Sequence, residues 1–290
     1  MLEHLNRLAE TPRRVVVIGG GGFVGSSIAH RLRREAIEVA TVTRRDCDLL
    51  APEAPEILAC LLKPGDSIVF VSAVAPAKTV EQFALNIRMA EAMCAALAKS
   101  EVGHLLYISS DAVYADDANP VTEQSPLAPS TLHGMMHAAR ELMLKSASAA
   151  PAAMLRPTLI YGASDPHNGY GPNRFRRQAA KGEPIAIFGE GEERRDHVLV
   201  EDVAELALLI LQRRSRGALN AVTGIATSFH DIAQLVARQF PGGRVVSVPR
   251  PGPRPHLLHR HFDVTHRLKA FPEFHPVPLA EGLERARQEA

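Results

Sequence analysis

Short apolar runs alternate with amphipathic stretches along the first half of the chain. The first run, Val15 to Ile18, is rich in β-branched residues and ends in four consecutive glycines. The stretch Leu132 to Ala147 instead places apolar residues at helical spacing, at positions 132, 135, 136, 139, 142 and 143. Apolar runs of the first kind predict further strands at 38–43, 67–71, 105–109 and 153–155. Stretches of the second kind predict one helix that begins near Gly22 and further helices at 52–62, 80–99 and 132–147. The alternation predicts an α/β fold, a doubly wound parallel sheet with helices on both faces and ligands at the carboxyl ends of its strands.

Two later stretches interrupt this alternation. Residues 162–172 are rich in Gly, Pro, Asn and Asp, and residues 244–275 are dense in Pro, Arg and His. Because such compositions are typical of loops, we expect a small C-terminal substrate-binding lobe that loops connect to the sheet. The predicted division assigns 12–163 and 198–223 to the sheet domain, and 164–197 and 224–290 to the smaller lobe.

Composition narrows the class of partner. The formal net charge of +1 gives no electrostatic case for nucleic acid or an anionic membrane surface. Cys47, Cys60 and Cys94 form no CxxC pair, which favours reduced thiols over disulfides or a zinc site. No apolar run is long enough to span a bilayer, and the N-terminal stretch lacks the apolar region of a signal peptide. We therefore expect a cytoplasmic protein that binds small molecules.

The glycine string after the first predicted strand is the first candidate site. Gly19, Gly22 and Gly25 have the spacing GxxGxxG, between a strand and a helix. A turn that cradles phosphate needs glycine for positive φ, for close approach of a pyrophosphate and for tight packing of helix on strand. The N–H groups at the start of the helix would face the phosphates. A mobile surface loop is the alternative, and the place of the turn after the first strand favours the dinucleotide site.

The end of the second predicted strand bears on the choice of dinucleotide. An acidic residue there typically binds the ribose 2′-hydroxyl of NAD, whereas arginine accommodates the 2′-phosphate of NADP. This chain has Thr43, Arg44 and Arg45, and no acid before Asp46. The sequence therefore favours NADP(H) over NAD.

Five motifs follow one another from the glycine string onward, namely Gly19 to Gly25, Tyr107 to Tyr114, Leu155 to Gly162, Ile187 to His197, and Val200 to Val203. In this order and at these intervals they resemble the extended short-chain dehydrogenase/reductases, the NAD-dependent epimerase/dehydratase proteins that act on nucleotide sugars. The resemblance runs from about Arg14 to the C-terminus. It implies a Rossmann fold, hydride transfer between a nicotinamide and a sugar carbon, and a homodimer formed through the helices at 80–99 and 132–147.

The resemblance also implies a catalytic serine, tyrosine and lysine. Ser110 stands at the serine position, four residues before Tyr114. Histidine occupies both positions of the expected YxxxK motif, as His133 and His137, and Glu141 follows as in the family. What these two histidines do is therefore the central question about the function of this protein.

Three interpretations of the histidine pair stay open. An imidazole has an ordinary pKa of about 6.5, so His133 would exchange a proton without a neighbouring ammonium. His137, one turn later on the same face, would bind the ribose hydroxyls. Alternatively the chemistry is lost, an interpretation that Leu159 favours because the family has a substrate-contacting asparagine there. Thirdly, histidines four residues apart are a known metal-ligand pair, although no HExxH motif accompanies them.

The resemblance assigns further residues by position, each with a structural alternative. Asp111 and Tyr114 would supply the missing proton if they point inward, although Tyr114 is expected to pack in its turn. The remaining residues that it assigns to the cofactor site are Phe23, Val24, Asp48, Ala73, Asn86 and Pro157. Asp48 would contact the adenine, with a turn or cap as its alternative. Asn86 would bond backbone and water beneath the active site, with a local helix irregularity as its alternative. The substrate contacts are Ser110, Asp111, Asn173, Arg195 and Arg254, where Asn173 would equally cap a helix and Arg254 would equally be a solvated loop residue.

Two functions of different classes follow. The first is an NADP(H)-dependent oxidoreductase or epimerase that acts on a nucleotide sugar, uses Ser110 and His133, and needs no metal. The second is a cofactor-binding protein without turnover, which acts as a sensor or interaction partner through the same pocket. Turnover of a nucleotide sugar distinguishes them.

Overall fold

A parallel sheet of six strands forms the centre of the computed structural model, which describes residues 2–250 and 258–289. The strands lie in the order β10-β5-β4-β3-β1-β2. Their bounds are β1 Arg14–Ile18, β2 Glu38–Val42, β3 Ser67–Phe70, β4 His104–Ile108, β5 Ala152–Pro157 and β10 Gly217–Ala221. Because β2 and β3 pair with opposite edges of β1, the strand order reverses beside β1, where α/β sheets bind ligands.

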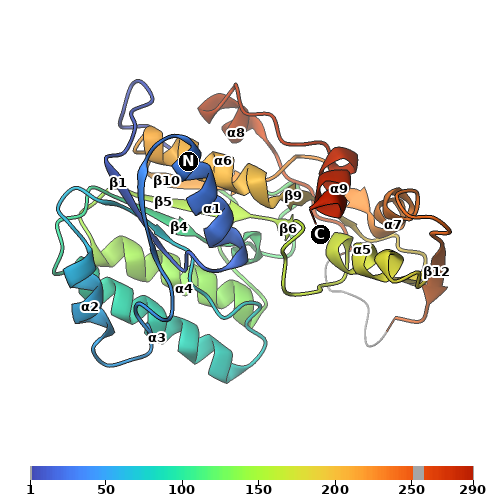
Figure 1. Ribbon diagram of the computed structural model, residues 1–290, viewed down its shortest axis with the longest axis horizontal. Coiled ribbons are helices and arrows are strands. Elements are labelled where there is room, and N and C mark those ends of the chain that lie inside the picture. The colour runs from blue at the N-terminus through green and yellow to red at the C-terminus, as the bar shows by residue number, and fades with distance from the viewer. Residues whose placement is uncertain (1, 251–257, 290) are drawn as a thin grey trace.

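Helices cover both faces of this sheet, as Figure 1 shows. One layer consists of α1 and α6, and the other of α2, α3 and α4. Their bounds are α1 Phe23–Arg34, α2 Ala54–Leu61, α3 Val80–Leu97, α4 Leu132–Ala147 and α6 Val200–Gln212. The predicted doubly wound α/β fold is therefore confirmed.

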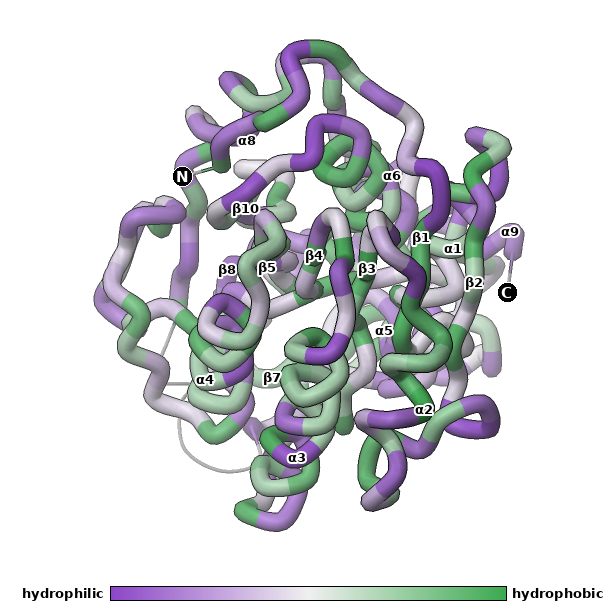
Figure 2. The backbone as a smooth tube through the Cα atoms, turned by 90° about the vertical axis from the view of Figure 1, so that its left-hand side faces the viewer, coloured by the Kyte–Doolittle hydropathy of each residue, from purple (hydrophilic) through white to green (hydrophobic). Residues whose placement is uncertain are grey.

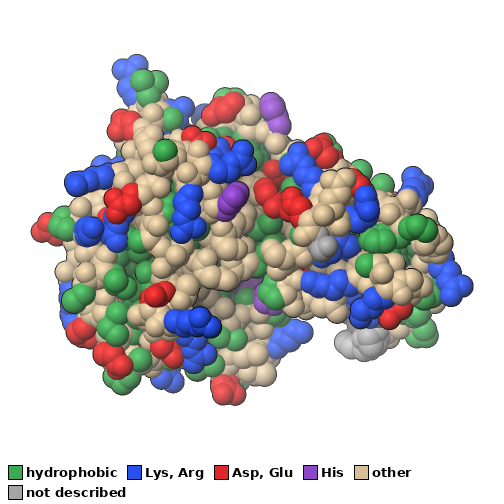
Figure 3. All heavy atoms as spheres, in the orientation of Figure 1, with side chains coloured by type: hydrophobic (Ala, Val, Ile, Leu, Met, Phe, Trp, Pro, Cys, Tyr) green, Lys and Arg blue, Asp and Glu red, His purple; other side chains and the backbone are tan. Residues whose placement is uncertain are grey.

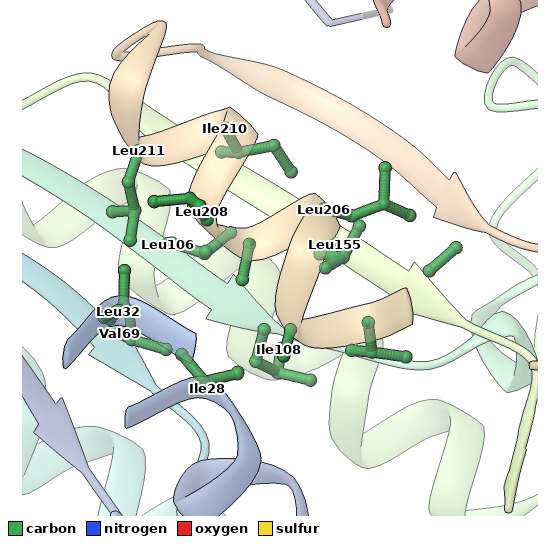
Figure 4. Close-up of a cluster of buried hydrophobic side chains, with 14 of the residues drawn as sticks. Ile28, Leu32, Val69, Leu106, Ile108, Leu155, Leu206, Leu208, Ile210 and Leu211 are labelled. Atoms are coloured by element: carbon green, nitrogen blue, oxygen red, sulfur yellow. The ribbon is translucent and has the colours of Figure 1, made fainter. Parts of the chain in front are cut away.

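Alternation along β1 explains why the sheet needs two helical layers. Val15 and Val17 belong to the buried cluster under α1 and α6, whereas Val16 and Ile18 belong to the cluster under α3. A strand buried on both faces is apolar at consecutive positions, which Figure 2 shows as hydrophobic strands inside the sheet. In Figure 4, Leu206 of α6 lies over Leu155 of β5.

A smaller part of the molecule, on the right in Figure 1, has its own apolar core. Phe175, Ile185 and Phe229 are buried in this core. The short strands here pair two by two, β6 with β9, β7 with β12, and β8 with β11. The bounds are β6 Leu159–Tyr161, α5 Pro172–Ala180, β7 Ile185–Phe188, β8 Arg194–Arg195, β9 His197–Leu199, β11 Thr227–Ser228, α7 Phe229–Ala237, β12 Val245–Val248 and α9 Leu279–Gln288.

The remaining helical elements are both short, the 3-10 turn η1 Asp111–Val113 and the helix α8 Thr265–Ala270.

The division into two domains stays a prediction. Within the part assigned to the smaller lobe, Phe271 and Phe274 pack into the core beneath α1 and α6 instead. In the described part of the chain, no helix is both long and apolar enough to cross a membrane.

Candidate functional site

Two cavities lie side by side along the carboxyl ends of the strands. The first has a volume of about 650 Å³ and is lined by the turn after β1, the end of β2 and the segment after β3. The second has a volume of about 420 Å³ and lies between the ends of β4 and β5, helix α4 and residues 165–173. Ala73 lines both cavities, so they are adjacent. In Figure 3 a histidine side chain is visible at the hollow between the two parts of the molecule.

The glycine turn forms one wall of the first cavity. Gly19 has φ +96°, and a Cβ atom there would lie 2.7 Å from the backbone nitrogen of Ser72. A Cβ on Gly25 would lie 2.2 Å from the carbonyl oxygen of Gly19, so this glycine allows helix and turn to pack. A Cβ on Gly22 would meet only ordinary contact at 3.5 Å. Gly22 therefore faces space, at the N-terminus of a helix with no acidic residue in its first turn.

Charged side chains follow β2, and Arg44, Arg45 and Asp48 among them line the first cavity. Asp46 accepts hydrogen bonds from the backbone and hydroxyl of Thr43, at 2.8 and 2.7 Å, and these bonds lower the pKa of Asp46. The guanidinium of Arg44 lies 3.1 Å from the Asp48 carboxylate, and Arg45 lines the same cavity. Asp48 also accepts a backbone N–H two residues on, so it closes a turn in addition to lining the cavity.

Both histidines of the substituted motif line the second cavity. Their ring centroids are 4.7 Å apart, which confirms that they share a face of α4. The backbone N–H of Ala77 donates to Nδ1 of His133 at 3.4 Å, and Nδ1 of His137 lies 2.7 Å from the hydroxyl oxygen of Tyr107. Burial lowers the pKa of His133 below 6.5. Burial lowers the pKa of His137 well below 6.5, and the neighbouring His133 and Arg140 lower it further. The pKa of each ring is therefore lower than the ordinary imidazole value that the sequence suggested.

Tyr107 and Arg140 were not singled out from the sequence. Arg140 is fully buried, donates to the carbonyl oxygen of Ser72 at 2.7 Å, and packs its guanidinium over the rings of Phe70 and Tyr107. The sequence signal was a charged residue on the apolar face of the helix at 132–147, three positions after His137. A positive charge thus lies beneath the histidine pair.

Asn86 bonds to the backbone, as the resemblance implies for this helix position, and makes no contact with either cavity. Its amide accepts the backbone N–H of Val74 at 3.0 Å and donates to the carbonyl oxygens of Val74 and Gln82. Arg140 donates to the same amide oxygen at 3.4 Å. Asn86 is fully buried and is not among the residues that line either cavity. It positions the segment after β3, which itself lines both cavities.

Ser110 and Asp111 follow β4 and line the second cavity. The Ser110 hydroxyl accepts the backbone N–H of Ala112 at 3.2 Å and donates to Oδ1 of Asp111 at 3.4 Å. Burial raises the pKa of Asp111, and the guanidinium of Arg260, 3.6 Å away, partly opposes this. Asp111 is therefore an inward-facing carboxyl that holds its proton more readily than an exposed one.

A buried network fixes the floor of this cavity. Arg156 binds both oxygens of the Glu141 carboxylate, at 2.8 and 2.6 Å, and Ser109 donates to it at 2.7 Å. Tyr114 donates to Asn220 at 2.7 Å and accepts from Arg156 at 2.8 Å. Burial raises the pKa of Tyr114 to about 12. The expectation that Tyr114 packs in its turn is confirmed, which removes it as a proton donor.

The expected substrate contacts are only partly brought together. Asn173 lines the second cavity, where its amide donates to Asp165 at 2.7 Å. Arg195 pairs with Glu193 at 2.6 Å and is not among the residues that line this cavity. Arg254 lies outside the described residues. The remaining cofactor contacts expected from the resemblance, Phe23, Val24, Ala73 and Pro157, line the second cavity.

The metal interpretation of the histidine pair would require further ligands beside His133 and His137. In the described residues, no group of three or more His, Cys, Asp or Glu side chains is arranged to hold a metal ion. The three cysteines, Cys47, Cys60 and Cys94, are free thiols.

Comparison with protein families identifies one match, to the NAD dependent epimerase/dehydratase family over residues 15–225. The chain is 26% identical to the ADP-L-glycero-D-manno-heptose-6-epimerase of Alkalilimnicola ehrlichii, over 82% of this chain and 84% of that protein. It is also 26% identical to the UDP-glucose 4-epimerase of Azospirillum brasilense, over 87% of this chain and 85% of that protein.

Solved structures share the fold over nearly the whole chain. The UDP-N-acetylglucosamine 4-epimerase of Bacillus cereus superposes with a TM-score of 0.82 at 20% identity, covering 95% of each chain. The UDP-glucose 4-epimerase of Thermotoga maritima superposes with a TM-score of 0.83 at 21% identity, over 95% of this chain and 98% of that one. At these identities the likeness demonstrates the common fold.

Proposed function

The chain belongs to the NAD dependent epimerase/dehydratase family, and from this premise we propose that it is an enzyme that uses NADP(H) to transfer hydride at a sugar carbon of a nucleotide sugar. One observation carries this proposal. Ser110, His133 and Pro157 line a single cavity that adjoins the glycine turn. A sugar in that cavity would have polar side chains on its reacting oxygen and the cofactor site beside it.

The residues of the first cavity fit a dinucleotide phosphate. The open face of Gly22, at the start of α1, offers backbone N–H groups to a pyrophosphate. Arg44 and Arg45 line the same cavity where a 2′-phosphate would lie, which favours NADP(H) over NAD. The bound nicotinamide cofactor supplies or accepts the hydride.

His133 acts on the sugar oxygen through Nε2. Because a backbone N–H donates to Nδ1, the neutral ring carries its proton on Nε2. A fixed Nε2–H donor stabilises negative charge on an oxygen, so this arrangement favours reduction of a sugar carbonyl. The neutral ring is also the form that its lowered pKa predicts at pH 7.

The proton comes from the neighbouring pair Ser110 and Asp111. The raised pKa of Asp111 lets its carboxyl retain a proton in the closed site. When the Asp111 carboxyl is protonated, it donates to the Ser110 oxygen, 3.4 Å from its Oδ1, and Ser110 passes its own proton to the sugar oxygen. Serine thus keeps the position that the family resemblance gives it, while a carboxyl replaces the missing phenol.

His137 and Arg140 share the tasks of the missing lysine. His137 lines the cavity and offers a ring nitrogen to the cofactor ribose. The positive charge comes from Arg140, beneath the site, and its contact with the carbonyl oxygen of Ser72 orients the segment that lines the first cavity.

A non-catalytic cofactor-binding protein is the second candidate. One observation favours it, because the neutral His137 places no ammonium beside the cofactor, where the resemblance leads one to expect a lysine. In that case the same cavities would bind NADP(H) and a nucleotide sugar for sensing or for interaction with a partner.

Mass spectrometry distinguishes the candidates. Nucleotide sugars and their 4-keto derivatives are incubated with the protein and either NADPH or NADP⁺. The enzyme produces a product two mass units heavier or lighter than its substrate, or an isomer that separates chromatographically. Tight NADP(H) binding without any product supports the non-catalytic candidate.

A homodimer through α3 and α4 is part of the proposal. Val80, Met135 and Leu142 of these helices are exposed, and such apolar side chains are typical of a covered helix face. Analytical ultracentrifugation tests it, and a monomer at micromolar concentration would refute it.

A further inference from the structure

We infer that Arg260 is a positioning residue for the proposed reaction, which holds the Asp111 carboxyl so that its proton faces Ser110. The inference rests on the proposed function, in which Asp111 and Ser110 together deliver that proton to the sugar oxygen. Arg260 follows Asp111 by 149 residues and is not among the residues that line the second cavity. Its effect on the reaction therefore passes through Asp111.

The guanidinium of Arg260 is buried against the η1 turn. Arg260 is 4% exposed, and it donates to the carbonyl oxygens of Asp111 and Ala115, both at 3.0 Å. A buried charge is costly unless it is paired and hydrogen-bonded. Here the carboxylates of Asp111 and Asp116 lie 3.6 and 4.0 Å from the guanidinium. Arg260 thus binds the turn that carries Asp111 through both its backbone and its side chain.

The two oxygens of the Asp111 carboxyl face different partners. Oδ2 lies 3.6 Å from the Arg260 guanidinium, whereas Oδ1 lies 3.4 Å from the Ser110 hydroxyl. Because a proton on Oδ2 would face a cation, the protonated carboxyl carries its proton on Oδ1. Arg260 therefore directs the acidic hydrogen to the oxygen that faces Ser110.

Backbone contacts fix the position of Arg260 itself. Its N–H donates to the carbonyl oxygen of Arg194 on β8 at 3.3 Å, and His259 forms a β-bridge with the same residue. The carbonyl oxygen of His261 accepts the N–H of Val121 at 2.8 Å. The segment on which Arg260 lies is thus held by two other parts of the chain, independently of the guanidinium.

Charged groups from several segments act on the Asp111 carboxyl. Burial raises its pKa, and the cations Arg260 and then Arg195 lower it. The carboxyl of Asp196 is also close, since Asp111 adds to the effect of burial in raising the pKa of Asp196. Because Arg260 has the larger effect of the two cations, a neutral side chain in its place should raise the pKa of Asp111 further.

The alkaline limb of the pH profile tests the inference, with NADPH and a sugar substrate found by mass spectrometry. A carboxyl that donates a proton acts only while it is protonated, so kcat falls as pH rises through the Asp111 pKa. Arg260→Gln removes the cation, and its limb should move to higher pH by about one unit. Arg260→Lys keeps the charge and should keep the limb of the wild type. The KM for the sugar should hardly change, because Arg260 does not line the cavity.

Carbon-13 NMR follows the same carboxyl without turnover. In protein labelled at the aspartate carboxyl carbons, the signal of Asp111 is the one that Asp111→Asn loses. Its titration midpoint should be higher in Arg260→Gln than in the wild type, and unchanged in Arg260→Lys. Arg260→Met, an apolar chain of similar length, takes the place of the glutamine variant if a buried amide prevents folding.

Arg14→Gln is the matched control. Arg14 is a partly buried arginine at the amino end of β1, where it pairs with Asp66 at 2.6 Å and lines neither cavity. Its replacement should lower the melting temperature and leave the titration of Asp111 as it is in the wild type.

The failures are distinguishable. An unchanged NMR midpoint in the neutral variants of Arg260, or an equal upward shift in Arg260→Lys, overturns the role of Arg260 while the proposed function stands. If the wild type converts no nucleotide sugar, the proposed function fails and proton delivery fails with it. The NMR titration then still decides whether Arg260 controls the Asp111 carboxyl.

Discussion

The hydroxyl oxygen of Tyr107 lies 2.7 Å from Nδ1 of His137, so a strand in the middle of the sheet fixes the orientation of a histidine in the second cavity. Burial raises the pKa of Tyr107, and the phenol therefore keeps its proton and donates it to Nδ1. The neutral ring of His137 then carries its own proton on Nε2. His137 thus presents an Nε2–H donor to the second cavity.

Replacing this phenol should affect both stability and cofactor binding. Tyr107→Phe leaves Nδ1 of His137 unpaired in the interior, which should lower the free energy of unfolding by about 1–3 kcal/mol. The affinity for NADPH should also fall, because the ring is no longer fixed as a donor to the ribose. Urea unfolding and calorimetric titration measure the two effects.

A second buried tyrosine provides the control for this experiment. Tyr114→Phe removes a hydroxyl that binds Asn220 and Arg156, away from His137. It should lower stability to a similar extent and leave NADPH affinity unchanged. If Tyr107→Phe binds NADPH as the wild type does, then the phenol has no part in presenting His137 to the cofactor.

The arginines after β2 should determine the choice of cofactor. Arg44→Ala combined with Arg45→Ala should weaken NADP⁺ binding roughly tenfold or more for each guanidinium removed from the 2′-phosphate, and leave NAD⁺ binding little changed. Arg88→Ala, on α3, is a suitable control because Arg88 does not line the first cavity. Tighter binding of NAD⁺ than of NADP⁺ by the wild type would contradict the choice of NADP(H).

Two glycines of the turn should respond differently to substitution. Gly22→Val should abolish dinucleotide binding in a folded protein, because its Cβ meets only ordinary contact at 3.5 Å and points to where the pyrophosphate would lie. Gly25→Ala should instead destabilise the fold by about 1–3 kcal/mol, because its Cβ would lie 2.2 Å from a backbone oxygen. Thermal unfolding and cofactor titration separate the two effects. Normal dinucleotide binding by Gly22→Val would refute the phosphate cradle.

The role of His133 should be visible in the pH profile. Its lowered pKa means that the neutral ring predominates at pH 6.5 and above. Protonation of Nδ1 would turn that nitrogen into a donor that faces the Ala77 N–H, so the contact that orients the ring is lost and activity falls as pH drops through the folded-state pKa, which lies below 6.5. His133→Phe should lower kcat about a hundredfold or more and lose this acidic limb. Cofactor affinity should hardly change.

The control for this variant is His167→Phe, which alters an exposed histidine lining the same cavity. It should keep both the rate and the acidic limb. Full activity in His133→Phe on a substrate found by mass spectrometry would exclude His133, and Asp111→Asn would then be the next variant to examine.

Local patterns in the sequence determined the fold and the glycine turn after β1. The alternation of apolar runs with helical spacing predicted the order of strands and helices, and the helix at 132–147 was predicted with the bounds that the structure has. The spacing of Gly19 and Gly25 followed from the sequence, whereas the close approach of the Ser72 backbone to Gly19 comes from the distant segment after β3. The helical period likewise placed His133 and His137 on one face.

Only the tertiary structure decided what surrounds these histidines. Tyr107 and His137 are 30 residues apart in the chain, and the packing of α4 on the sheet brings them into contact. The same packing buries Arg140 under the site and engages the Asn86 amide. A side chain's pKa and its free hydrogen-bonding capacity depend on burial and on neighbours from distant segments, and periodicity along the chain does not specify those.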